Sequence, residues 1–277
     1  KDMRRTEAAL GKNTPRFCAA ESKYRSEVKK HWVTAHSLPA GHVLCKTDLV
    51  MKRVHGHTGE PIELNKLLGR RLTTNVKDET PLTRTFVETT TWILVVARLF
   101  STRLPRKALI PVAGMPALSH LFERLKQATS IDQIILCTTT NSEDDELVLV
   151  AEEHNVRCHR GPVDDVLDRM LGALEGYSVD AVVRVTADDI LIDPSYLDRA
   201  VEHHFSSNAE YTDIKALPSG TEVEVFDTEL LQTISSSARH PEGTEYLTTY
   251  VIDNQEQFRT AKAIVDPSHE RDWRLTL

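Results

Sequence analysis

Residues 92–107 read WILVVARLFSTRLPRK, and this stretch decides the fold. Residues 93–97 form an unbroken apolar run of strand length, which is typical of a strand buried on both faces of a parallel sheet. Four cations and two hydroxyls follow within the next ten residues. Because ligands bind beyond the carboxyl ends of parallel strands, the stretch predicts an α/β domain whose binding site begins directly after its first strand.

Strand and helix signals alternate after this stretch. Apolar runs predict strands at 134–137, 156–158 and 181–186. Helices are predicted to open at Pro116 and to span 144–153 and 163–174, with apolar residues along one face of each. This alternation predicts a Rossmann-like α/β domain over residues 91–277 with a mostly parallel sheet.

The chain before residue 91 has a different character. Residues 31–90 hold short β-like pieces separated by turns, which predict a small β-rich module. Residues 1–30 are polar and charged and are interpreted as a linker, the tail of a larger preceding domain that is missing here. The expected organisation is therefore a linker, a β-rich module and an α/β domain.

Composition narrows the function classes. The net charge of −7 divides unevenly, with 17 basic and 10 acidic residues in 1–90 against 17 basic and 31 acidic residues in 91–277. An acidic domain is repelled by nucleic acid, so no nucleic-acid partner is expected. The four cysteines form no C-x-x-C pair, and no apolar stretch reaches membrane-span length. We expect a soluble protein of the reducing cytoplasm that has no membrane partner.

The cationic loop suits a triphosphate. Arg98, Arg103 and Lys107 can neutralise phosphate oxygens through charge-assisted hydrogen bonds, and Ser101 can add a hydroxyl. Asp188 follows the strand 181–186, so in a parallel sheet it lies at the same edge as this loop. One carboxylate with substrate phosphates is the kind of site that Mg²⁺ prefers.

These motifs resemble a known family. The loop is similar to the A-R-x-x-S-T-R-L-P-x-K signature of cytidylyltransferases that activate acidic sugars, particularly the spore-coat-polysaccharide type. Further matches follow in order: residues 137–145, 160–169, 183–188, 191–194 and 222–226. The resemblance covers about residues 92–277.

The resemblance implies a reaction and its residues. The anomeric hydroxyl of a keto-sugar acid would attack the α-phosphorus of CTP, and pyrophosphate would leave. It implies that Arg98 and Lys107 are catalytic, that Arg98, Ser101, Arg103 and Lys107 bind the nucleotide, and that Asp188 binds Mg²⁺. Thr138, at the end of the second strand, is a candidate for the nucleoside side.

The first module resembles the antifreeze-like (SAF, β-clip) domain at the end of sialic acid synthases, on residues 35–41, 49–53 and 67–72. The fusion implies a bifunctional enzyme that makes and activates a nonulosonic acid, such as sialic, legionaminic or pseudaminic acid, for surface polysaccharide biosynthesis. The resemblance also implies a homodimer in which Arg53 contacts substrate only when a barrel partner is present.

Four positions depart from the cytidylyltransferase pattern: Phe100, Arg106, Ala187 and Ile190. Two of them replace glycine, whose missing Cβ lets a backbone approach phosphates closely. An alternative interpretation is therefore a weakened or inactive nucleotide-binding or assembly module. A glycosyltransferase of similar fold is a weaker alternative, because the sequence has no Asp-x-Asp motif at the strand ends.

Overall fold

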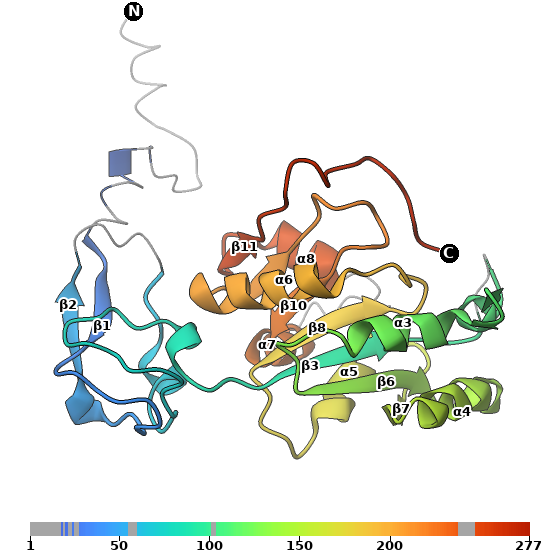
Figure 1. Ribbon diagram of the computed structural model, residues 1–277, viewed down its shortest axis with the longest axis horizontal. Helices are drawn as coiled ribbons and strands as arrows, with labels where there is room; N and C mark the ends of the chain where they lie inside the picture. Colours follow the sequence, from blue (N-terminus) through green and yellow to red (C-terminus); the bar gives the residue numbers. More distant parts are fainter. Residues whose placement is uncertain are drawn as a thin grey trace, which may run out of the picture.

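A computed structural model describes residues 18, 20–21, 24, 28–54, 60–100, 104–237 and 247–277. Figure 1 shows a small β-rich body from the first part of the chain beside a larger layered α/β body. The linker predicted over residues 1–30 lies almost entirely outside the described residues. The boundary between the two bodies falls near residue 90, where the first strand of the large sheet begins.

The large body is built on a seven-stranded sheet in the order β11-β9-β10-β8-β3-β6-β7. The strands are β3 (Thr91–Val96), β6 (Gln133–Thr139), β7 (Arg157–Gly161), β8 (Ala181–Thr186), β9 (Tyr211–Asp213), β10 (Glu224–Asp227) and β11 (Thr260–Lys262). Strand β3 pairs in parallel with β6 and β8, and β6 pairs in parallel with β7. Strand β10 alone runs antiparallel to its neighbours. The predicted mostly parallel sheet is confirmed.

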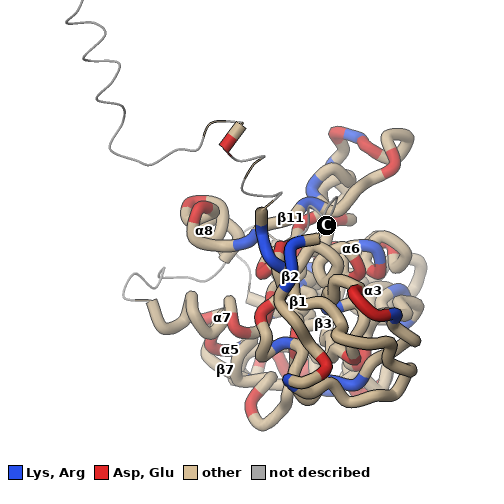
Figure 2. Tube along the Cα trace, turned by 90° about the vertical axis from the view of Figure 1, so that its left-hand side faces the viewer, with Lys and Arg blue, Asp and Glu red and all other residues tan. Residues whose placement is uncertain are grey.

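Helices cover both faces of this sheet. One face carries α3 (Ala117–Leu125), α4 (Asp145–Glu153) and α6 (Pro194–Ser206), and the other carries α5 (Val166–Leu174), α7 (Thr228–Ser236) and α8 (Leu247–Asp253). Each helix buries its apolar face against the strands, which gives a separate apolar core on either side of the sheet. Figure 2 shows acidic residues along α5 and α7.

Helix α5 begins three residues later than the apolar pattern predicts. Asp165 is its N-cap, and its side chain accepts a hydrogen bond from the backbone N–H of Asp168. A side-chain cap satisfies one of the first N–H groups, which have no partner inside the helix. The preceding residues 163–165 are therefore free to form the wall of a cavity instead of a helical turn.

The small body holds few regular elements. Its strands β1 (Lys30–Thr34) and β2 (Leu49–Arg53) form one antiparallel pair. Isolated bridges and 3₁₀ turns complete it around a compact core of Leu38, Leu44, Leu49, Ile62, Leu67, Leu72, Val76, Leu82 and Val87. Arg53 ends β2 and is exposed, next to the equally exposed Lys52 in the basic segment of β2 in Figure 2. A β-rich module is thus present where the sequence predicts it.

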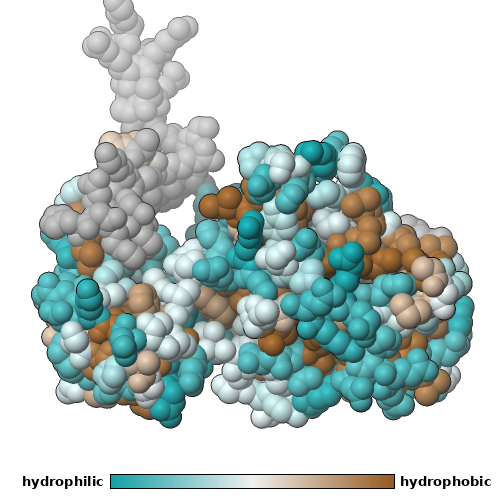
Figure 3. All heavy atoms as spheres, in the orientation of Figure 1, coloured by the Kyte–Doolittle hydropathy of each residue, from teal (hydrophilic) through white to brown (hydrophobic). Residues whose placement is uncertain are grey.

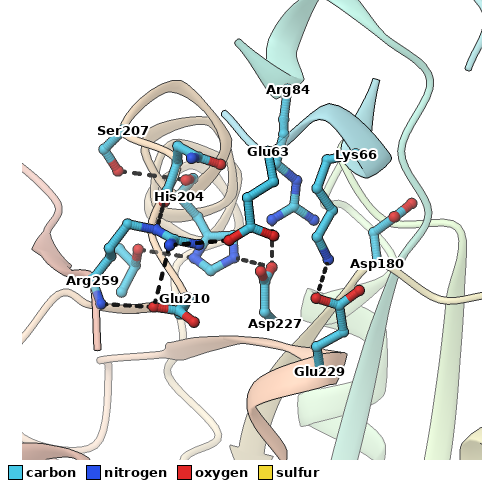
Figure 4. Close-up of polar contacts among 12 residues, drawn as sticks. Glu63, Lys66, Arg84, Asp180, His204, Ser207, Glu210, Asp227, Glu229 and Arg259 are labelled. Carbon is cyan, nitrogen blue, oxygen red and sulfur yellow. Dashed lines mark hydrogen bonds and ion pairs between the residues drawn. The ribbon is translucent and has the colours of Figure 1, made fainter. Parts of the chain in front are cut away.

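A buried polar network joins the two bodies (Figure 4). Arg84 of the small body donates to Asp227, and both side chains are almost fully buried. His204 of α6 lies 3.1 Å from the same carboxylate oxygen and 3.0 Å from the hydroxyl of Thr212. The guanidinium of Arg84 also lies 4.5 Å from the ring centroid of Phe205. Charge pairing and a cation–π contact together fix the orientation of this buried arginine.

Exposed and half-buried ion pairs surround this network. Arg70 donates through two nitrogens to Asp180, and Lys66 lies 2.7 Å from Glu229. Figure 3 shows the two bodies meeting along a narrower waist. Pairs that keep contact with water contribute little each. Removing one partner of the buried Arg84–Asp227 pair should therefore cost more stability than removing one partner of an exposed pair.

Within the described residues, no helix is both long and apolar enough to cross a membrane.

Candidate active site

A large cavity with a volume of about 740 Å³ opens at the carboxyl ends of β3 and β8. Its walls come from the loop after β3, the start of α5, the end of β8 and the C-terminal segment. Five cations line it: Arg98, Lys107, Arg169, Arg184 and Arg274. Two acidic residues, Asp164 and Asp188, also line it. The cavity is therefore suited to a strongly anionic ligand.

Lys107 and Asp188 meet at the mouth of this cavity as the sequence predicts. The ammonium of Lys107 donates to one carboxylate oxygen of Asp188, and Thr276 donates to the same oxygen at 3.1 Å. Burial opposes ionisation of Asp188, but the hydrogen bond and charge of Lys107 outweigh it and lower the pKa of the carboxyl. Asp188 is thus ionised at neutral pH.

Arg106 shapes the turn that presents Lys107. It adopts a left-handed conformation with φ of 59° at the start of the turn Lys107–Leu109. Its side chain points out of the cavity and pairs with Glu146. Glycine adopts this conformation more readily than arginine does, and the departure from glycine therefore strains the backbone but does not fill the site.

Of the remaining predicted loop residues, some belong to the part of the chain that the structure describes and others do not. Arg98 lines the cavity directly after β3. Ser101 and Arg103 lie outside the described residues, so their predicted roles stay predictions. Phe100 lines the cavity wall with 65% of its surface exposed, which leaves the opening unblocked.

Thr138 is not brought into the cavity. It is fully buried within β6, and its hydroxyl has no hydrogen-bond partner among the described residues. Its neighbours Cys137 and Thr139 point to the opposite face because side chains alternate along a strand. Leu136, two residues earlier, packs in the core under α3 and α4, which places Thr138 on that side. The sequence located the strand end correctly but did not show which face Thr138 occupies.

Ala187 and Ile190, the other two departures, pack in the core beneath α3 and α6, and Ala187 also lines the cavity. Their extra bulk is therefore accommodated by the core. None of the four departures closes the cavity.

Arg169 was missed as a candidate site residue. It rises from α5 into the cavity wall, is 1% exposed, and donates to the carbonyl oxygen of Pro162 at 2.6 Å. Its Nε is buried without a partner among the described residues. A Cβ on Gly161 would lie 3.1 to 3.3 Å from Arg169 atoms, so this glycine leaves room for the arginine. The apolar periodicity of residues 163–174 identifies the buried face of the helix but does not indicate that Arg169 reaches the cavity.

Arg184 was also missed, because it lies inside a strand. It lines the cavity from β8, and its guanidinium lies 3.1 Å from a carboxylate oxygen of Glu224 on the adjacent strand β10. Its Nε is likewise buried without a partner among the described residues. A cation within an otherwise apolar strand was the available signal.

The donor set at the cavity mouth fits a divalent metal of the oxygen-preferring kind. Asp188 supplies one ionised carboxylate, and the described residues contain no group of three or more metal-ligating side chains. Mg²⁺ commonly takes one or two carboxylates and completes its shell with water and substrate phosphates. A resident cage of protein ligands would instead suit zinc.

A sheet with cations and an ionised carboxylate at the carboxyl ends of its parallel strands is the arrangement expected of a nucleotidyltransferase. Comparison with known proteins narrows the class. The Cytidylyltransferase family model matches residues 92–270, which is more than half of the 277-residue chain. The chain belongs to the cytidylyltransferase family.

Individual relatives agree with this assignment. The uncharacterized protein MJ1063 of Methanocaldococcus jannaschii is 33% identical over 166 residues, which are 60% of this chain and 68% of the relative. The spore coat polysaccharide biosynthesis protein SpsF of Bacillus subtilis is 30% identical over 171 residues, with 60% and 71% covered. A 3-deoxy-manno-octulosonate cytidylyltransferase of Geobacter metallireducens is 32% identical over 115 residues, and only 42% of its length is covered.

Solved structures show the same fold. A cytidylyltransferase from Leptospira borgpetersenii serovar Hardjo-bovis superposes with a TM-score of 0.63 and 28% identity, covering 69% of this chain and 82% of that chain. Rv0371c of Mycobacterium tuberculosis superposes with a TM-score of 0.51 at 16% identity, over 68% and 92%, and shows the fold alone.

Proposed function

We propose that this cytidylyltransferase transfers CMP from CTP to an acidic keto-sugar, with pyrophosphate as the leaving group. The observation that carries the proposal is the cavity whose cationic walls meet the Lys107–Asp188 pair at the carboxyl ends of the sheet. The names of SpsF and of the 3-deoxy-manno-octulosonate enzymes support an acidic sugar in polysaccharide biosynthesis. Nonulosonic acids, including sialic, legionaminic and pseudaminic acids, are the acceptors we propose to test first.

The described residues supply binding and charge neutralisation. Arg98 and Lys107 would hold triphosphate oxygens, and Ser101 and Arg103 belong to the same proposed loop. Transfer at phosphorus requires little covalent chemistry from the protein, because positioning and electrostatic stabilisation provide most of the acceleration. The attacking hydroxyl forms a new bond to the α-phosphorus while the bond to the pyrophosphate oxygen breaks.

Asp188 is the residue that would hold Mg²⁺ in this proposal. When bound, Mg²⁺ neutralises charge on the phosphates and helps to align them. Lys107, which pairs with Asp188, would also be available to a phosphate oxygen of the nucleotide. The proton of the attacking hydroxyl would pass to water.

The experiment that tests the function measures pyrophosphate release from CTP and Mg²⁺ over a panel of keto-sugar acids. Calorimetric titration of the protein with CTP in the presence of Mg²⁺ measures nucleotide binding separately. The same titration with UTP is the control for base selectivity. Turnover with one acid and CTP would support the proposal. Binding of CTP without turnover on any acid would favour the alternative of a nucleotide-binding or assembly module, and no binding at all would defeat the proposed transfer reaction.

We further propose that residues 31–90 are an SAF-like domain of a bifunctional synthase and cytidylyltransferase that forms a homodimer. The β-rich core and the position of Arg53 at the exposed end of β2 support this proposal. Arg53 would contact a sugar only if a partner barrel lay over it. Light scattering of the full-length gene product measures the oligomeric state. A synthase assay that compares R53A with the neighbouring control K52A tests the role of Arg53. A monomer whose synthase activity is the same in both variants would contradict it.

A further inference from the structure

Arg184 differs from the other cavity cations because it belongs to the sheet itself. Arg98 lies in the loop that follows β3, and Lys107 lies just after that loop. Arg184 instead lies within β8. Its side chain is 15% exposed and lines the cavity, and its Nε is buried without a partner in the described part of the chain. A buried N–H without a partner is energetically unfavourable, but Arg84 has one as well, so it is the cavity lining that marks Arg184 as open to a ligand.

Glu224 holds Arg184 in place. Glu224 accepts from the hydroxyl of Tyr211 at 2.7 Å and from Thr248 at 2.5 Å, and its other oxygen lies 3.1 Å from the Arg184 guanidinium. The carboxylate is thus anchored by two neighbours before it meets the arginine. A guanidinium held at one nitrogen keeps its remaining N–H groups in a fixed plane, which suits a planar anion.

Arg184 lies on a different side of the cavity from Arg169, whose Nε is also buried without a partner among the described residues. Strand β3 lies between β6 and β8 in the sheet. Arg169 lies beside Cys137 of β6, and Arg184 lies on β8 next to β10. In the proposed function the triphosphate lies against Arg98 and Lys107, so Arg184 on β8 remains for the acceptor. Arg274 of the C-terminal segment is a further cation of the cavity lining.

We propose that Arg184 binds the carboxylate of the acceptor acid and thereby selects acidic over neutral sugars. This inference rests on the proposed function and adds a specificity-determining residue to it. A carboxylate presents two charged oxygens that a guanidinium can bind through two parallel N–H groups, whereas a neutral hydroxyl offers neither the charge nor the second oxygen. Glu224 is the positioning residue that aims Arg184 at the acceptor.

The test compares R184Q and R184K with wild type in pyrophosphate release, with the KM of the acid and the affinity for CTP measured separately. R157Q on β7 is the matched control, because Arg157 also belongs to a strand but contacts Tyr177 outside the cavity. We expect R184Q to raise the KM of the acid by roughly tenfold or more, with CTP affinity within about twofold of wild type. R184K should recover part of the loss.

A neutral amide of the same sugar acid provides the decisive comparison. Wild type should prefer the acid to the amide, and R184Q should lose most of that preference because the carboxylate no longer has its partner. If R184Q weakens CTP and acid binding equally, or keeps the preference for the acid, the carboxylate assignment is wrong. If wild type turns over no acid at all, the proposed function itself fails, whatever Arg184 does. Melting curves show whether each variant is folded, and R184K retains the charge should R184Q unfold.

Discussion

Strand β10 carries a buried carboxylate at each end, and the two ends serve different parts of the molecule. Glu224 pairs with Arg184 at the cavity, while Asp227 pairs with Arg84 at the contact with the small body. Both arginines have one buried nitrogen without a hydrogen-bond partner among the described residues, Nε in Arg184 and a terminal nitrogen in Arg84. An unpaired buried nitrogen therefore does not by itself identify a binding site.

The surroundings of the two arginines make the difference. Arg84 is 2% exposed, lies over the ring of Phe205 and lines no cavity that the structure describes, whereas Arg184 lines the large cavity. His204, which is fully buried, shares the Asp227 carboxylate with Arg84. The Arg84 end is thus a closed structural contact, and the Arg184 end is open to a ligand. The following experiments test that division.

The largest effect is expected at the cavity. D188N should lower kcat/KM by about 100- to 1000-fold, the range for losing one preorganised charged group, while the melting temperature stays near that of wild type. D164N at the same cavity is the matched control and should have a much smaller effect. Pyrophosphate release and thermal unfolding measure the two quantities. A D188N enzyme with wild-type activity would place the metal and phosphates elsewhere.

A large stability effect is expected at the closed end. R84M removes one member of a buried ion pair and leaves Asp227 without its charge partner, which typically costs about 3 to 5 kcal/mol. The urea unfolding midpoint measures this loss. The double variant R84M/D227N should recover part of it, because no uncompensated buried charge remains. CTP affinity of the folded R84M protein should be unchanged, and a loss of affinity would show that the two ends are coupled.

Acidification should weaken the same closed contact. Burial lowers the pKa of His204, so the folded state favours the neutral ring and the unfolded state binds the proton more tightly. The resulting stability is fully present above the ordinary histidine pKa of about 6.5 and is lost as the pH falls below it. Melting temperatures between pH 7.5 and 5 should fall, and H204N should show a shallower dependence. An equally steep dependence in H204N would assign the titration to another group.

The smallest effect is expected at Arg106. Its side chain is exposed, pairs with Glu146 and points out of the cavity. R106A should therefore leave CTP affinity and turnover unchanged, whereas R106G should slightly stabilise the left-handed turn that precedes Lys107. Steady-state kinetics and melting curves measure both. A strong loss of activity in R106A would mean that this departure from the family pattern takes part in the site.

The sequence by itself determined the order and type of the main elements in residues 91–277. The apolar run before Arg98 identified the first strand, and the parallel alternation that followed predicted that Lys107 and Asp188 would lie at one edge of the sheet. These inferences hold because burial on both faces of a strand requires a continuous apolar pattern, which can be read locally. The β-rich character of residues 31–90 was readable from turn and strand signals in the same way.

Only the tertiary structure decided which side chains share the cavity. Thr138 faces the opposite side of the sheet, Arg169 and Arg184 enter the cavity from a helix and a neighbouring strand, and Arg84 meets Asp227 across 143 residues of chain. A one-residue shift along a strand reverses the face, and pairing between distant segments leaves no local periodicity. Local patterns therefore specify the elements, while strand order and helix packing select the residues that meet.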